Sequence, residues 1–383
     1  MNGSSKLRKR KHGWAGWRWI LAAPFLLAAF PALADCAACA ATARRFAVDQ
    51  HFNGVILVGH GSQVDYVESF GVADAQTQRP LTADTPFESG SISKWIASML
   101  VMRLVQQGEL ALDRPISTYL PDYRRDNGNK LTLRHLLSHA SGVPNEIDEA
   151  IKRDPSVRLL SLDNAEAVRR YASGDLRFAP GTDWDYSHAN WLLVKAIVEK
   201  VTGRSYVSLV DGYLVQPLAL RHSGVYTGSS SKVPGMALGY RQLAPHPIAL
   251  DKPSPDFMAL AGGYYASAND LFALMDGLFG GRLLSPESTR TLMSVERSPQ
   301  HYALGGRTKT LSFAGVEHPV AWEYGSNGAF RALAWRTLDD GHSVIVLNNT
   351  SFDHLKIGEL ATTLMEASYG PAPAASALSR PKN

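Results

Sequence analysis

The sequence contains little cysteine and relatively little charge. Only two of its 383 residues are cysteines, Cys36 and Cys39, and charged residues make up 19%. Two cysteines cannot form a disulfide framework or a zinc module with several cysteine ligands. Their C-x-x-C spacing predicts a local disulfide in an oxidising compartment, because no βαβ pattern surrounds it as a thioredoxin-like redox site would require. With 45% hydrophobic residues, the composition indicates a globular protein of one large domain or two modest ones.

The N-terminal segment lacks an apolar run long enough to anchor a folded protein in a membrane. A basic stretch at 6–11 precedes an apolar run of 12 residues at 19–30, and Ala32-Leu33-Ala34 follows as a small-x-small cleavage pattern. We therefore interpret residues 1–34 as a signal peptide that directs the chain to the periplasm or outside the cell, with no stable membrane span after cleavage. The alternative is an uncleaved anchor whose interfacial tryptophans are Trp14, Trp17 and Trp19.

Excess positive charge is confined to this leader. The whole chain has a formal net charge of +4, but residues 1–34 hold six basic residues and no acid. The remainder has 33 basic and 35 acidic residues, a net charge of −2. A slightly acidic body has no electrostatic footprint for nucleic acid, so we expect no nucleic-acid partner.

Hydrophobic periodicity predicts strands near both ends of the chain and helices between them. The predicted strands are 55–58, 64–67, 330–336 and 343–348. The predicted helices are 91–107, 131–139, 190–201, 206–214, 268–279, 286–293 and 352–367. This order favours an α+β fold with one antiparallel sheet flanked by helices, an all-helical lobe and a site between them. The Pro/Ala-rich tail, 369–383, is expected to be flexible.

The helix that begins at Ser91 is apolar on all sides, which is typical of a buried helix. Lys94 follows one turn later on the same face. Burial lowers the pKa of a lysine and makes it a plausible base for a serine nucleophile, and free N–H groups at the helix N-terminus could hold an oxyanion. The alternative is that Ser91 caps the helix and Lys94 extends to solvent.

Two further segments carry candidate site residues. Tyr186 lies on a loop that leads into a predicted helix, and a phenol near an ammonium is favoured as a phenolate that can relay a proton. Residues 323–330, Glu-Tyr-Gly-Ser-Asn-Gly-Ala-Phe, precede the second predicted hairpin, and their glycines would allow close approach of a ligand. A packed aromatic and an ordinary turn are the alternatives.

These segments together resemble the serine β-lactamase and penicillin-binding-protein superfamily, nearest its class C β-lactamase, D-Ala-D-Ala carboxypeptidase and family VIII esterase-like branch. The resemblance covers residues 45–368, in the same order along the chain. It rests on Phe87-Glu88-Ser89-Gly90-Ser91-Ile92-Ser93-Lys94, Leu131-Thr132-Leu133-Arg134-His135-Leu136-Leu137-Ser138-His139-Ala140-Ser141-Gly142, Pro180-Gly181 through Tyr186-Ser187, Val201-Thr202-Gly203, Gly262-Gly263-Tyr264-Tyr265-Ala266-Ser267 and Val346-Leu347-Asn348-Asn349.

The resemblance implies a β-lactamase/transpeptidase-like fold and a role for each matching residue. Ser91 would be the acylated nucleophile, Lys94 its partner and Tyr186 the proton relay to the leaving group. The backbone N–H groups of Ser91 and Ser326 would form the oxyanion hole. No metal or organic cofactor is implied. His135 and His139 lie four residues apart but have no acidic or third ligand nearby in sequence, so we do not expect zinc there.

The chain departs from the family pattern at two positions. The second motif is usually Tyr-x-Asn, and here His188 stands in place of Asn. The third is usually Lys-Thr-Gly or His-x-Gly, and here Glu323-Tyr324-Gly325 occupies it; a register shift that places Trp322 there fits the following residues less well. A glutamate ~4 Å from a substrate carboxylate would repel it by about 1 to 4 kcal/mol. We hypothesise that His188 and Glu323 pair and, with Tyr324 and Gly325, bind a neutral or cationic substrate.

The sequence therefore predicts an exported serine hydrolase that forms an acyl-enzyme on Ser91, acting on a small-molecule or peptide substrate. Ester or amide hydrolysis is the first prediction. D-Ala-D-Ala carboxypeptidase or class C-like β-lactamase activity is the second. A third reading, from another class, is a catalytically impaired penicillin-binding-like sensor, which the altered second and third motifs favour and the intact Ser91, Lys94 and Tyr186 oppose. The oligomeric state stays open.

Overall fold

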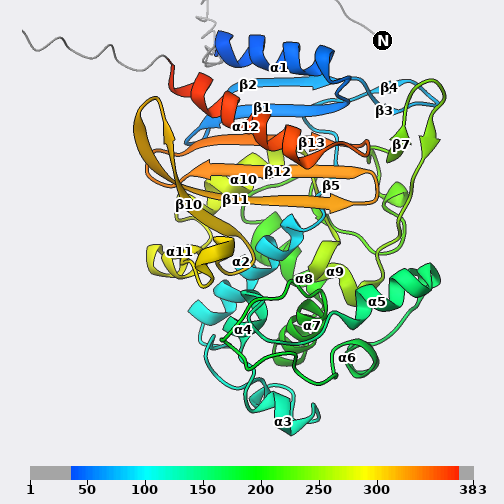
Figure 1. Ribbon diagram of the computed structural model, residues 1–383, viewed down its shortest axis with the longest axis vertical. Helices are drawn as coiled ribbons and strands as arrows, with labels where there is room; N and C mark the ends of the chain where they lie inside the picture. Colours follow the sequence, from blue (N-terminus) through cyan, green and yellow to red (C-terminus); the bar gives the residue numbers. More distant parts are fainter. Residues whose placement is uncertain (1–35, 371–383) are drawn as a thin grey trace, which may run out of the picture. The chain divides into compact units, whose positions relative to one another are not determined.

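A computed structural model describes residues 36–370 of the chain (Figure 1). The predicted signal peptide, 1–34, and most of the predicted tail, 371–383, lie outside the described residues. All described residues belong to one compact unit.

A six-stranded antiparallel sheet joins the two ends of the chain, as predicted. Its strand order is β10-β11-β12-β13-β1-β2. Pairing of Gly54 with Asn348 and of His60 with His342 sets the register between the first and last strands. The sheet consists of β1 (Gly54–His60), β2 (Gln63–Phe70), β10 (Arg307–Phe313), β11 (Val316–Asn327), β12 (Phe330–Thr337) and β13 (His342–Asn348). The short strands are β3 (Val72–Asp74), β4 (Arg79–Pro80), β5 (Phe87–Glu88), β6 (Gly224–Val225), β7 (Tyr240–Gln242), β8 (Ile248–Ala249) and β9 (Tyr264–Ala266).

Helices flank the sheet and form the middle of the chain. Those packed on the sheet are α1 (Ala37–Asp49), α2 (Ile92–Gln106), α10 (Ala268–Phe279) and α12 (His354–Tyr369). The others are α3 (Arg125–Gly128), α4 (Leu133–Leu137), α5 (Glu146–Arg153), α6 (Asn164–Tyr171), α7 (Ala189–Thr202), α8 (Tyr206–Val210), α9 (Ala259–Gly262) and α11 (Pro286–Met293). Figure 1 shows α12 crossing one face of the sheet and α2 lying between the sheet and the helical lobe.

Side chains alternate between the two faces of the sheet and build two hydrophobic cores. Along β1, Val55 and Leu57 belong to the large core shared with α2 and α10. Ile56 and Val58 belong to a smaller core under α1 and α12. Because successive side chains of a strand point to opposite faces, a strand covered on both faces is apolar throughout. The uninterrupted run of apolar residues in β1 follows from this.

The predicted buried helix is confirmed. Twelve of the 15 residues of α2 are buried, from Ile92 to Leu104. Helices α8, α9 and α11 contact it on the lobe side, while β11 and β12 contact it on the sheet side. Lys94, on the first turn of this helix, is therefore buried and not exposed to solvent.

Two parts of the fold differ from the sequence prediction. Helix α1 begins before residue 45 and packs against α12, so the folded unit includes a segment that we did not predict. Its alanines give it only a weak apolar stripe, which periodicity does not detect. Strand β11 extends to Asn327, so Glu323 to Asn327 lie within the sheet and not in a turn before it. Glycine and proline in this strand obscure its period of two.

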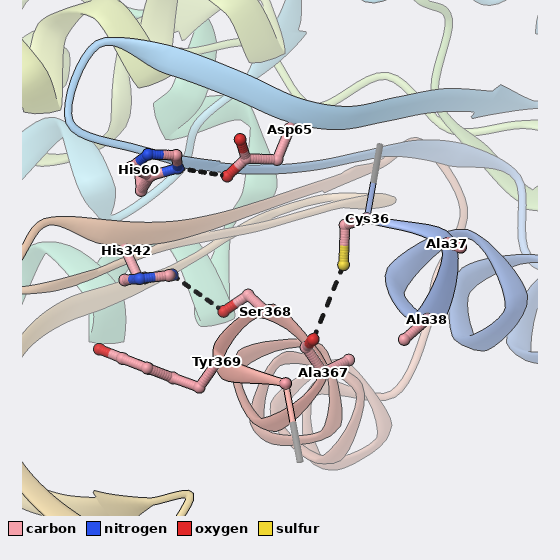
Figure 2. A pocket seen from close by; sticks show the side chains of 10 residues that line it. Cys36, Ala37, Ala38, His60, Asp65, His342, Ala367, Ser368 and Tyr369 are labelled. Carbon is pink, nitrogen blue, oxygen red and sulfur yellow. Dashed lines mark hydrogen bonds and ion pairs between the residues drawn. The ribbon is translucent and has the colours of Figure 1, made fainter. Parts of the chain in front are cut away.

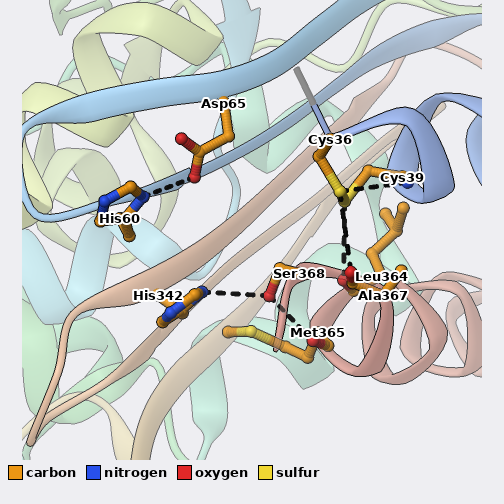
Figure 3. Close-up of a disulfide and its surroundings, with 9 residues drawn as sticks. All are labelled: Cys36, Cys39, His60, Asp65, His342, Leu364, Met365, Ala367 and Ser368. Atoms are coloured by element: carbon orange, nitrogen blue, oxygen red, sulfur yellow. Dashed lines mark hydrogen bonds and ion pairs between the residues drawn. A yellow bond between two sulfur atoms is a disulfide. The ribbon is translucent and has the colours of Figure 1, made fainter. Parts of the chain in front are cut away.

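The predicted local disulfide is present at the start of α1. Cys36 and Cys39 are bonded to each other (Figure 3). Cys36 Sγ lies 3.7 Å from the carbonyl oxygen of Ala367, near the end of α12. The bond thus closes the first turn of α1 beside α12, a local structural role. Within residues 36–370, no helix is both long and apolar enough to cross a membrane.

Candidate active site

Ser91 stands at the N-terminus of α2, where its hydroxyl is free to react. It occupies the N-cap position, but its side chain makes no capping hydrogen bond. Lys94 Nζ, one turn along the helix, donates to Ser91 Oγ at 3.1 Å and to the carbonyl oxygen of Ala261 at 2.6 Å. The capping alternative for Ser91 and the solvent-exposed alternative for Lys94 are both wrong, because the two side chains contact each other.

Lys94 is fully buried, with 0% of its surface exposed. Burial lowers its pKa to about 7, although the negative charges of Glu323 and Asp148 partly offset this effect. Within the described residues it forms no ion pair; its partners are a hydroxyl and a carbonyl. A lysine in this setting is largely neutral just above pH 7 and can accept a proton from Ser91.

Tyr186 completes a three-residue cluster. Its hydroxyl donates to Ser91 Oγ at 2.8 Å, and Lys94 Nζ lies 5.1 Å from the centre of its ring. Burial, together with the negative charge of Glu323, raises its pKa above the usual value. Tyr186 is therefore a neutral phenol and not the phenolate that we expected beside an ammonium.

The imidazole of His139 packs against the ring of Tyr186. The two rings stack with centres 4.3 Å apart. The backbone N–H of Ser187 donates to His139 Nδ1 at 3.0 Å, and Asn190 Nδ2 lies 3.2 Å from the same nitrogen. His139 is buried and its pKa is well below the usual value because of that burial. It is therefore a neutral positioning residue, and its Nδ1 is already engaged by the segment that carries Tyr186.

Two glycines allow the backbone of β11 to approach Ser91. A Cβ on Gly90, whose φ is +51°, would lie 2.3 Å from the backbone nitrogen of Ser326. A Cβ on Gly325 would lie 1.8 Å from the carbonyl oxygen of Ser89. No larger side chain fits at either place. Among the described residues, β10 pairs with β11 only as far as Trp322, so this pairing does not reach Ser326.

Ser91 and Ser326 both line a cavity of about 90 Å³. Ser326, whose backbone N–H the resemblance assigns to the oxyanion hole, therefore lines the same cavity as Ser91. The remaining lining residues come from the helical lobe and the end of β11. They are Asp148, Arg158, His188, Ser254, Met258, Ala261, Gly262 and Asn327.

The side chains of the third motif have partners that we did not expect. Glu323 is 3% exposed and accepts hydrogen bonds from Arg307 Nη1 at 2.6 and 2.5 Å. Tyr324 points to the opposite face of the sheet, where its ring lies 5.7 Å from His354 of α12. Because neighbouring residues of a strand alternate, only one of these two side chains can face the site. Gly325 acts through close backbone packing.

The hypothesised pair between His188 and Glu323 is wrong. His188 Nδ1 lies 2.9 Å from both carboxylate oxygens of Asp148, on α5. Asn145 holds this pair, since its Nδ2 donates to Asp148 at 2.8 Å and its Oδ1 accepts from the backbone N–H of His188 at 3.0 Å. Each member of the predicted pair therefore has its own partner from a segment that the sequence reading did not connect with it.

Four site residues were missed: Asn145, Asp148, Arg158 and Arg307. All are distant in sequence from the motifs that they serve. Histidine in place of asparagine at residue 188 indicated that this side chain has a different hydrogen-bond partner. Nothing in the sequence identifies Asp148 as that partner. Arg307 lies directly across from Trp322 in the β10–β11 pairing. Because β10 was not predicted, the sequence analysis could not place Arg307 beside Glu323.

One group of described side chains has atoms suited to a metal. His318, Asp339 and Asp340 bring their ligand atoms within 4.8 Å of one another. His318 Nδ1 already lies 2.8 Å from Asp339, and the two carboxylates are exposed. This group does not line the cavity at Ser91. In the other histidine pair, His135 and His139, the Nδ1 of His139 accepts a hydrogen bond from the backbone N–H of Ser187.

A larger pocket of about 450 Å³ lies on the other side of the molecule's sheet, beside the disulfide (Figure 2). His60 Nδ1 lies 2.7 Å from Asp65, and His342 Nδ1 lies 3.1 Å from Ser368 Oγ. The rings of His60 and His342 stack with centres 5.5 Å apart. This pocket shares no lining residue with the cavity at Ser91.

Comparisons with known proteins agree with this architecture. The Beta-lactamase family model matches residues 39–364. Esterase EstB of Burkholderia gladioli is 28% identical over 363 residues, an alignment that covers 82% of this chain and 90% of the esterase. The structure of a D-stereospecific amidohydrolase from Streptomyces sp. aligns with a TM-score of 0.69 at 25% identity, and the alignment covers 85% of this chain and 98% of the amidohydrolase. The structure of the hydrolase EstCE1 aligns with a TM-score of 0.71 at 23% identity, and the alignment covers 88% of this chain and 99% of EstCE1. The predicted family and fold are thereby confirmed.

Proposed function

We propose that this chain, a serine hydrolase that belongs to the Beta-lactamase family, is exported and forms an acyl-enzyme on Ser91 with ester or amide substrates. The observation that carries the proposal is the convergence of Lys94 Nζ and Tyr186 Oη on Ser91 Oγ, at 3.1 and 2.8 Å. A nucleophile within hydrogen-bond reach of a base and of a proton donor is the arrangement that acyl transfer requires.

Acylation uses these three side chains in turn. Neutral Lys94 takes the proton of Ser91 as Oγ forms a bond to the acyl carbon. The N–H groups of Ser91 and Ser326 hold the resulting oxyanion. As the bond to the leaving group breaks, Tyr186 gives its hydroxyl proton to the departing oxygen or nitrogen, and the ammonium of Lys94 restores that proton to Tyr186. The products are the acyl-enzyme and a neutral alcohol or amine.

Esters are the preferred substrates in this proposal. The third-motif position offers no ammonium or hydroxyl for a substrate carboxylate, since Glu323 is bound by Arg307 and Tyr324 faces α12. This argument replaces the electrostatic repulsion that we expected from Glu323, because the guanidinium of Arg307 lies against this carboxylate as its counter-charge. The similarity to an esterase supports the ester, and the similarity to an amidohydrolase supports the amide.

One observation favours a second candidate function. Arg158, on the turn Pro155–Leu159, lines the cavity with Ser91. A guanidinium suits a carboxylate, the group that D-Ala-D-Ala carboxypeptidase and β-lactamase substrates carry. D-Ala-D-Ala peptides and β-lactams are therefore the alternative substrates for the same acyl-enzyme chemistry.

Export is proposed from the sequence of residues 1–34, with the periplasm or the medium as the destination. Expression of the full chain in a bacterium, followed by fractionation and N-terminal sequencing, tests it. A mature N-terminus at Asp35 in an extracytoplasmic fraction is expected. A full-length chain in the cytoplasm would contradict the proposal.

The central test is acylation of the purified chain, read by intact mass spectrometry. The reagents are a p-nitrophenyl ester, a penicillin and a fluorophosphonate, each applied to the wild type and to Ser91→Ala. We expect a Ser91-dependent adduct with ester turnover and slow or absent reaction with penicillin. Rapid penicillin hydrolysis would transfer the assignment to the second candidate. A stable adduct without turnover would indicate a sensor, and no adduct with any reagent would contradict acyl-enzyme chemistry.

A further inference from the structure

Histidine is an unusual residue at position 188. The family that this sequence resembles usually has asparagine there, and an asparagine side chain cannot take up a proton at neutral pH. Here the imidazole has a carboxylate partner, Asp148, at 2.9 Å. It also lines the cavity of about 90 Å³ that contains Ser91. The cavity at Ser91 is therefore lined by a titratable imidazole at the position where the family usually has an amide.

The contacts of His188 determine which of its nitrogens carries the proton. Hydrogen bonds from His188 and Asn145, and the charge of Lys94, hold the pKa of Asp148 below its usual value despite burial. An ionised carboxylate only accepts hydrogen bonds, so Nδ1 of the imidazole must be the donor. In the neutral ring, Nε2 then has a free lone pair. The carboxylate therefore prepares Nε2 as a proton acceptor.

The surroundings keep this imidazole neutral. The charged groups that act on it are Lys94 on α2, Asp148 on α5 and Arg158 on the neighbouring turn. Burial, followed by the charge of Lys94, lowers the pKa of His188 below its usual value. A neutral histidine beside an ionised carboxylate is the protonation state of a general base.

The acylation machinery leaves a role for a second base. Lys94 and Tyr186 both bond to Ser91 Oγ, so they are placed to exchange protons with that oxygen. The water that cleaves an acyl-enzyme needs a base at its own position. His188 is bonded to Asp148 and not to Ser91, and it faces the same cavity.

We propose that His188, held by Asp148 and Asn145, is the general base that activates the hydrolytic water in deacylation. The inference rests on the proposed acyl-enzyme at Ser91. Water gives a proton to His188 Nε2 as its oxygen bonds to the acyl carbon. The bond from that carbon to Ser91 Oγ then breaks, and Oγ takes the proton of Tyr186. The proton held by His188 passes to Tyr186 through the cavity, so the sum is acyl-enzyme plus water giving free enzyme plus carboxylic acid.

The test separates the two half-reactions with a p-nitrophenyl ester in rapid mixing. His188→Asn keeps an amide that can donate to Asp148 but cannot accept a proton. We expect a full burst of p-nitrophenolate, one per active site, followed by turnover about 100-fold slower than in the wild type. Intact mass spectrometry should show the acyl-enzyme accumulating on Ser91. The rate of fluorophosphonate labelling, which needs no deacylation, should change less than about threefold.

Two further variants sharpen the result. Asp148→Asn retains the imidazole but removes the acceptor that sets its tautomer, and it should slow deacylation at least about tenfold with the burst intact. His60→Asn, in the pocket on the other side of the sheet, is the matched control and should behave as the wild type.

The outcomes distinguish this inference from the function on which it rests. Unchanged steady-state turnover in His188→Asn, with a normal Ser91 adduct, overturns the role of His188 alone. Equal losses in burst rate, labelling and turnover also overturn it, since they indicate a purely structural residue. Absence of a Ser91 adduct in the wild type overturns the proposed function and this inference together.

Discussion

The chain contains two histidine–aspartate pairs of nearly the same geometry in two different regions. His188 lies 2.9 Å from Asp148 in the cavity at Ser91, and His60 lies 2.7 Å from Asp65 in the pocket beside the disulfide. Only the first has a serine held by a buried lysine and a tyrosine. In the second, Ser368 donates its hydroxyl proton to the carbonyl of Met365, and the described residues lining it include no lysine or arginine. The comparison teaches that the pair becomes catalytic machinery only through its neighbours.

Two buried lysines show the same principle. Lys195 on α7 is 3% exposed and lies 2.9 Å from Glu199 and 2.8 Å from Asp256. Lys94 is buried at least as deeply, but it contacts a hydroxyl and a carbonyl. The first lysine forms ion pairs with two carboxylates, whereas burial lowers the pKa of Lys94 to about 7. The first therefore holds the lobe together and the second is suited to proton transfer.

The largest effect should come from removing the nucleophile. Ser91→Ala should reduce kcat for a p-nitrophenyl ester by at least about 10⁴-fold, because no other group replaces Oγ. Ser368→Ala, the matched change in the second pocket, should leave kcat unaltered. Steady-state kinetics measure both. Comparable losses in the two variants would show that the two regions had been assigned wrongly.

The next effect concerns the two lysines. Lys94→Met should reduce kcat about 10²- to 10⁴-fold with little loss of stability, because it removes the base. Lys195→Met should leave kcat nearly unchanged but lower the free energy of unfolding by about 1 to 3 kcal/mol, because Glu199 loses its buried partner. Kinetics and urea titration on both variants give the four values. An inactive Lys195→Met that is fully folded would contradict this division of roles.

Breaking the ion pair of Glu323 should affect stability more than specificity. Glu323→Gln leaves Arg307 without its carboxylate and should cost about 3 to 5 kcal/mol of unfolding free energy. The matched Glu296→Gln, which breaks a half-exposed pair with Arg134, should cost less than about 1 kcal/mol. Penicillin reactivity of Glu323→Gln should not rise. A marked rise would restore repulsion by Glu323 as the determinant of specificity.

The smallest effect is a pH dependence. Lys94 must be neutral to accept a proton and has a pKa of about 7, so the acylation rate should rise about tenfold per pH unit below 7 and level off above it. The unfolded chain holds the Lys94 proton up to about pH 10.4, so its contribution to stability increases from pH 7 toward that value. Burst rates and thermal midpoints across pH 5.5–9.5 test both signs. A burst rate that falls as the pH rises through 7 would be inconsistent with a neutral Lys94.

Local patterns predicted much of the fold correctly. The helix after Ser91, the helices Ala268–Phe279 and Pro286–Met293, and the last hairpin all form where periodicity and turn residues placed them. Helix α1 and the strands β10 and β11 were not predicted, because their own side-chain patterns are weak and their stability comes from packing against the sheet and α12.

The sequence by itself paired Ser91 with Lys94 through their spacing on one helix, and its resemblance to a known family gave the fold and the third residue, Tyr186. Only the tertiary structure decided what the altered motif residues do. It assigned Glu323 to Arg307 and His188 to Asp148, and it turned Tyr324 away from the site. The physical reason is that an ion pair or a buried face depends on strand register and helix docking, which bring together residues that no sequence spacing connects.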